Sequence, residues 1–112
     1  MKHDVIAIEG GTDMIPITPN ASPAVPPRFP LGRVVITADA ARRIPWPVLM
    51  DGLRRHTTGD WGGLDPHDAR SNDEALIHGG RLLSAHGQDG QRFWIITEDD
   101  RAITTIVLPT GD

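Results

Sequence analysis

The sequence has no cysteine, which excludes disulfide bonds, thiolate catalysis and cysteine-ligated zinc. It also has no apolar run of about 18 residues and no lysine-led apolar leader, so we expect neither a membrane span nor a signal peptide. Its 11 Lys and Arg against 15 Asp and Glu give a net charge of -4 and no basic surplus for nonspecific nucleic-acid binding. These absences predict a cytoplasmic protein with no membrane partner, and they do not favour a nucleic acid as its partner.

The 112 residues suffice for one compact domain, and the 12 Gly and 10 Pro are more than an average chain carries. Six of the prolines lie between Pro16 and Pro30, where missing N–H donors and fixed φ angles oppose both helix and sheet. We therefore expect a Pro-rich N-terminal arm over residues 1–30 and a single domain over residues 31–112. Two short apolar runs in the arm, at 5–8 and 14–17, are candidates for lying along a sheet edge or in a groove.

The spacing of apolar residues predicts an α+β domain with two or three short helices followed by a three- to four-stranded antiparallel sheet. Thr37 is the expected N-cap of the first helix, and Pro47 suits the first turn of a second helix that runs to His56. Asp65 and Pro66 begin the third helix, and glycines follow its last turn. The expected strands are residues 33–36, 81–86, 91–97 and 102–108.

The last three strands predict a meander that is apolar on both faces. The simplest turns pair His86 with Gln91 and Thr97 with Ala102. One face then carries Leu82, Ser84, Phe93, Ile95, Thr104, Ile106 and Leu108, and the other carries Leu83, Ala85, Arg92, Trp94, Ile96, Ile103, Thr105 and Val107. An antiparallel sheet with one solvated face alternates instead, so each face needs a cover. The helices cover one face, which leaves the arm, the first strand or a second protein chain for the other.

The segment from Leu31 to Pro109, about seven tenths of the chain, carries a set of short motifs. They are Leu31-Gly32, Arg55-His56, Gly59-Asp60-Trp61-Gly62, Asp65, Asn72, Gly79, Arg81, Ser84, Trp94-Ile95-Ile96-Thr97-Glu98, Asp100-Arg101, Thr104-Thr105 and Leu108-Pro109. With these motifs the segment resembles a family of small bacterial proteins of unassigned activity, many of them from plasmids and integrated elements, and some described as plasmid-related or as type I restriction-modification subunits. The resemblance implies an origin in mobile elements and implies no particular activity. The sequence departs from the usual family pattern at His86, where Tyr is typical.

Polar residues on apolar stripes are the candidate site residues, because an unpaired polar group costs about 1–3 kcal/mol when buried. His56 shares the core-facing stripe of the second helix and is either a structural histidine, bonded to a carbonyl or to Asp60, or a general acid or base. Asn72 is expected to tie the loop that follows the third helix to that helix. Asp60 and Trp61 are expected to form a turn that seats the indole over the core.

Two functions of different classes fit these residues. The first is a non-catalytic interaction protein of mobile-element origin, an accessory regulator or an inhibitor of a host defence system, that binds a protein partner or itself. Its contact residues would be the apolar sheet positions Trp94, Ile96, Ile103, Thr105 and Val107, with Arg92 at the rim.

The alternative is a metal-independent ribonuclease or toxin-like enzyme with the helix-then-sheet architecture of barnase, colicins and RelE. His56, Arg81, Ser84 and Thr104 would supply its base, cation and hydroxyl groups. We expect no cofactor and no metal. His67 and His78 are about three turns apart on the third helix, and the pair formed by His56 and Asp60 has no third ligand.

Overall fold

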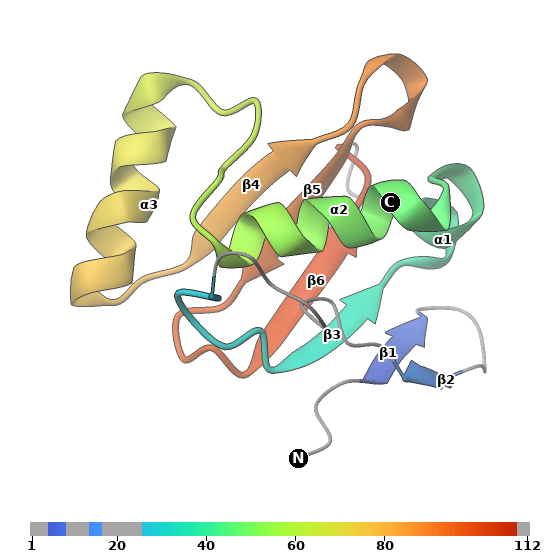
Figure 1. Cartoon of the computed structure of the whole chain (residues 1–112), viewed down its shortest axis with the longest axis horizontal. Helices are drawn as coiled ribbons and strands as arrows, with labels where there is room; N and C mark the ends of the chain where they lie inside the picture. Colours follow the sequence, from blue (N-terminus) through green and yellow to red (C-terminus); the bar gives the residue numbers. More distant parts are fainter. Residues whose placement is uncertain (1–4, 9–13, 17–25, 110–112) are drawn as a thin grey trace.

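Figure 1 shows the computed structural model of the chain, in which two helices cross one face of a twisted sheet and a third helix lies beside an edge strand. The structure describes residues 5–8, 14–16 and 26–109. The fold is α+β, as predicted. Its elements are β1 (Val5–Ile8), β2 (Met14–Pro16), β3 (Arg33–Ile36), α1 (Ala38–Arg43), α2 (Trp46–Thr57), α3 (Pro66–His78), β4 (Leu82–His86), the 3-10 turn η1 (Asp89–Gln91), β5 (Phe93–Thr97) and β6 (Ile103–Val107).

The strands form one sheet in the order β2-β1-β3-β6-β5-β4. The meander β4-β5-β6 is antiparallel, as expected, whereas β3 runs parallel to β6 and β1 runs parallel to β3. The sheet is therefore mixed and mostly antiparallel. The helices α1, α2 and α3 all lie between β3 and β4 in the sequence, and a crossover of that length returns the chain in the parallel direction.

Both hairpin registers predicted from the sequence were wrong by two residues. His86 pairs with Phe93 and Thr97 pairs with Thr104, because η1 and the turn before β6 take up more residues than the simplest turns. A shift of two residues preserves the face on which each side chain lies. The predicted division of the strands into two faces therefore holds in spite of the error.

The helices α1 and α3 each begin at a residue whose side chain caps the first turn. The Thr37 hydroxyl accepts a hydrogen bond from the amide of Ala40, and the Asp65 carboxylate accepts one from the amide of Asp68. The helix α3 ends at Gly79, which has a φ of +92° that favours glycine. Within the described residues no helix has the length and apolar character needed to cross a membrane.

The main core lies between the sheet and the pair α1 and α2. Its fully buried members include Ile36, Leu49, Leu53, Phe93 and Ile106. The helix α2 approaches the sheet closely at Gly52, where an added Cβ would lie 2.7 Å from Cζ of Phe93. Glycine at this position therefore sets the distance between α2 and β5.

The outer edge of β4 is covered rather than open. The Asn72 side chain on α3 donates to the carbonyl of Leu83 and accepts from its amide. It therefore supplies the hydrogen bonds that a neighbouring strand would make with this residue. The amide of Gly63 donates to the carbonyl of Ala85, whose own amide donates to the carbonyl of Trp61. Asn72 thus ties α3 to β4, instead of the expected loop, and strand pairing at this edge is blocked.

The folded unit starts upstream of Leu31, the expected boundary of the domain. Phe29 is buried with Trp61, Ala75 and Leu82 in a second apolar cluster. The apolar run at 5–8 extends the sheet as β1, paired with β3, and β2 pairs with β1. The rest of the expected arm, at 1–4, 9–13 and 17–25, lies outside the described residues.

Replacing Gly52 by Ala is expected to lower the free energy of unfolding by about 1–3 kcal/mol, since the added Cβ would lie 2.7 Å from a ring carbon of the fully buried Phe93. The gain in helix propensity, about 1 kcal/mol, works in the opposite direction. Chemical denaturation measures the difference. Gly90→Ala is the control, because a Cβ there meets nothing within 4 Å, and it should stay within about 0.5 kcal/mol of the wild type. Equal stabilities of the two variants would contradict the close approach at Gly52.

Candidate functional site

Five polar side chains form a continuous series of hydrogen bonds between α2 and the sheet. We call His86, Ser84, His56, Thr97 and Thr104 the buried polar row. His56 Nδ1 lies 2.6 Å from Ser84 Oγ, and His56 Nε2 lies 2.9 Å from Thr97 Oγ1. Ser84 Oγ also lies 3.0 Å from His86 Nε2, and Thr97 Oγ1 lies 2.7 Å from Thr104 Oγ1. The row ends at the carbonyl of Leu31, 2.6 Å from Thr104 Oγ1.

The direction of each hydrogen bond follows from the Leu31 carbonyl, which only accepts. Thr104 must donate to it, and Thr97 must then donate to Thr104. The single hydroxyl hydrogen of Thr97 is thereby used, so the hydrogen bond with His56 has Nε2–H as its donor. In the neutral imidazole Nδ1 is then the acceptor, and Ser84 donates to it.

The Ser84 oxygen in turn accepts from Nε2–H of His86. The row therefore implies one tautomer for each of the two histidines. Both ring nitrogens of His56 are engaged.

Two aromatic rings pack against the imidazole of His56. The rings of Phe29 and Trp61 meet the imidazole edge to face, with centroids 5.2 and 5.6 Å away. The indole Nε1–H of Trp61 donates to Asp73 on α3. As a result His56, Ser84, Thr97 and Thr104 are all 0 % exposed.

Burial lowers the pKa of His56 to about 3, and the nearby positive charges of His86 and Arg101 act in the same direction. Protonation would place a second N–H against the Ser84 hydroxyl, which already donates to that nitrogen. Burial also lowers the pKa of His86, with the carboxylate of Asp60 opposing the shift. His56 is therefore neutral at neutral pH, and its partners are hydroxyls rather than the expected carbonyl or Asp60.

The structure brings together three of the four residues that the sequence combined in a ribonuclease-like site. Ser84 and His56 have the separation of a nucleophile and its base, but neither has exposed surface through which a substrate would reach it. Arg81 does not join them. It is exposed, and strand alternation places it on the opposite face from Leu82 and Ser84.

Phe29, Thr97 and His86 were not among the predicted site residues. Thr97 and His86 interrupt the same apolar face of the strands as Ser84 and Thr104, and that pattern is the signal that finds them. Nothing in the local sequence of Phe29 indicates its burial, because a Pro-rich segment surrounds it.

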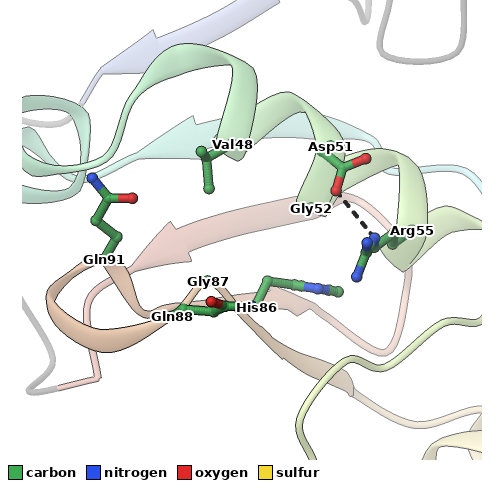
Figure 2. Close-up of a pocket in the computed structure, with 8 residues that line it drawn as sticks. All are labelled: Val48, Asp51, Gly52, Arg55, His86, Gly87, Gln88 and Gln91. Carbon is green, nitrogen blue, oxygen red and sulfur yellow. Dashed lines mark ion pairs between the residues drawn. The ribbon is translucent and has the colours of Figure 1, made fainter.

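A pocket of about 320 Å³ lies at the His86 end of the buried polar row (Figure 2). Asp51 on α2 holds Arg54 and Arg55 in ion pairs of 2.6 and 3.0 Å, and the hydrogen bond with Arg54 lowers the pKa of Asp51. Gln88 and Gln91 close the opposite side. The charged groups on this wall are already engaged with one another, so the pocket offers no free charge to select a ligand.

Asp65, His67 and Asp68 at the start of α3 place one potential ligand atom each within 4.8 Å of one another. All three are exposed, and Asp65 already caps the helix. Exposed acidic groups of this kind are common in proteins without a bound metal, so we propose no metal site at these three residues.

The second face of the sheet carries the residues expected to contact a partner. We call Val35, Leu83, Ala85, Trp94, Ile96, Ile103, Thr105 and Val107 the open sheet face. None of the three helices of the described chain lies over it (Figure 1). Ile103 is 41 % exposed, Trp94, Ile96, Thr105 and Val107 are half-buried, and Val35 is buried. Arg92 precedes β5 and is exposed at the rim.

In comparisons with known proteins, no family model, no curated protein and no solved structure matches this chain significantly. The resemblance to plasmid-borne proteins stays a prediction from the sequence.

His56 should make the stability of the protein depend on pH in a defined window. Its pKa is about 3 in the folded protein and 6.5 in the unfolded chain, so between these values the unfolded chain binds more protons. The contribution is therefore fully present above pH 6.5 and is lost as the pH falls toward 3. We expect the loss to be about 1.4 kcal/mol per pH unit.

Chemical denaturation of the wild type and of His56→Gln from pH 7 to pH 4 measures the contribution of His56 to the free energy of unfolding. The glutamine amide keeps a donor and an acceptor but does not titrate. The free energy of unfolding of the variant should therefore fall less steeply with decreasing pH than that of the wild type. The contributions of His86 and Asp51 are present in both proteins and cancel in the comparison. His67→Gln, which removes an exposed histidine, should follow the wild-type curve. Parallel curves for the wild type and His56→Gln would contradict the assignment.

Proposed function

We propose that this chain is a non-catalytic interaction protein that binds a protein partner through its open sheet face. The observation that supports the proposal is that the face is apolar along its centre and is left uncovered by the helices of the described chain. Apolar side chains in a contiguous exposed patch mark interaction sites, because their burial stabilises a complex by about 1.5–3 kcal/mol for each large side chain.

The two sides of the sheet differ in what they offer a ligand. On the helix side the polar groups of the buried polar row are engaged with one another and sealed by Phe29 and Trp61. On the open side Trp94 and Ile103 retain accessible surface. This contrast favours recognition over catalysis. With the sequence resemblance to plasmid-borne proteins, it supports an accessory regulator or an inhibitor of a host defence system.

A pair of matched double variants tests the proposal. Trp94→Thr with Ile103→Thr removes one indole and one isoleucine from the open sheet face and keeps strand propensity. Trp46→Gln with Ile77→Gln removes the same two residue types from the helix side, where Trp46 is 37 % and Ile77 is 75 % exposed.

Each protein is immobilised and exposed to extract of the source cells. The retained proteins are identified, and the affinity of the purified partner is measured by titration calorimetry. We expect the sheet variant to bind at least about 100-fold more weakly, which corresponds to about 2.7 kcal/mol, and the helix variant to bind like the wild type. Circular dichroism confirms that both variants are folded. A partner whose affinity is unchanged by the sheet variant, or is lost in the helix variant, would refute the proposal.

A further inference from the structure

The open sheet face is bordered by arginines at both of its ends. The strand registers align residues across the sheet, so that the row Leu83, Ile96, Thr105 and Val35 crosses its centre. Continuing the same registers by one step places Arg81 beside Glu98 and Glu98 beside Ile103, which itself pairs with Arg33.

The opposite end of the face is bordered by Arg92, which directly precedes β5. Strand alternation places Arg92 on the same side as Trp94 and Ile96. The apolar centre is thus bordered by three arginines and one glutamate.

The side chains of Arg33, Arg81 and Arg92 make no ion pair or hydrogen bond within the described chain. Some arginines elsewhere are engaged, since Arg54 pairs with Asp51 and Arg101 donates to backbone carbonyls, whereas Arg43 and Arg70 on the helices also make no side-chain ion pair or hydrogen bond within the described chain. The sequence has more acidic than basic residues, so a lack of carboxylates does not explain the difference. The guanidinium groups along the open sheet face remain available to a ligand.

A second copy of the chain is a poor occupant of this face. Two sheets that pack face to face lie about 10 Å apart, so stacked copies would bring their arginine borders toward each other. Like charges at that distance repel, and one glutamate per copy does not compensate. Pairing along the outer edge of β4 is also blocked, since Asn72 and Gly63 occupy the hydrogen-bonding groups of Leu83 and Ala85.

A nucleic acid is also disfavoured. Single strands are held by several aromatic side chains on which bases stack, and the open sheet face has Trp94 as its one aromatic residue among aliphatic ones. The net charge of -4 adds a general repulsion of phosphates. Aliphatic side chains and planar guanidinium groups instead suit a protein surface that has apolar residues and carboxylates, which arginine binds through two parallel hydrogen bonds.

We infer that the open sheet face binds an acidic protein surface, in which an apolar patch fits against Trp94, Ile96 and Ile103 while flanking Asp or Glu side chains pair with Arg33, Arg81 and Arg92. The inference rests on the proposed function and specifies the chemistry of the partner. Arginine borders of this kind determine specificity and association rate more than raw affinity, so binding should weaken as salt is added.

A random dodecapeptide display library selected on the full chain tests the inference without knowledge of the natural partner. We expect the enriched peptides to combine aliphatic or aromatic residues with flanking Asp or Glu. A synthetic enriched peptide is then titrated into matched charge variants. Arg81→Gln with Arg92→Gln should weaken its binding about tenfold at 50 mM salt. Arg43→Gln with Arg70→Gln removes two exposed helical arginines and should change binding less than twofold.

The other outcomes separate this inference from the proposed function. Enriched peptides without acidic residues whose binding is lost in Trp94→Thr with Ile103→Thr would overturn the acidic partner and leave the open sheet face as a binding site. Peptides insensitive to that sheet variant would overturn both. Light scattering that shows a dimer dependent on Trp94 would assign the face to a second copy, and stronger binding of a dodecamer oligonucleotide than of the peptides would assign it to nucleic acid.

Discussion

The carbonyl of Leu31 sets the direction of every hydrogen bond in the buried polar row. Because a carbonyl only accepts, the hydroxyls of Thr104 and Thr97 and both nitrogens of His56 have one consistent arrangement, which continues through Ser84 to His86. These bonds tie α2 to β4, β5 and β6 at one point. Phe29 and Trp61 pack against His56 at this point, on the side of the sheet that α1 and α2 cover.

Strand alternation divides the same three strands between two environments. Residues of one parity, including Ser84, Phe93 and Thr104, face the helices and are buried. Residues of the other parity, including Trp94, Ile103 and Val107, form the open sheet face. A hydroxyl or imidazole is stable on the closed side because it has a partner, and an apolar side chain on the open side gains stability when a partner covers it.

The contrast between the two candidate functions follows from accessibility. A histidine, a serine and threonines meet at distances that suit proton transfer, yet the same enclosure that fixes them keeps the imidazole neutral and removes it from solvent. Arg81, the cation of the ribonuclease hypothesis, lies at the border of the open sheet face with Arg33 and Arg92. Its position there suits recognition of carboxylates.

The sequence by itself determined the features that depend on neighbours along the chain. These are the capped helix α3, the four strands β3 to β6, and the face on which each residue of the meander lies, since alternation is unaffected by an error of two in the register. It also marked His56 and Asn72 as polar residues in apolar positions. Only the tertiary structure decided the parallel pairing of β3 with β6, the hydroxyl partners of His56, the burial of Phe29 and the arginine border. These contacts join residues far apart in the sequence, and their free energies depend on the packing of several elements at once, which a local pattern does not contain.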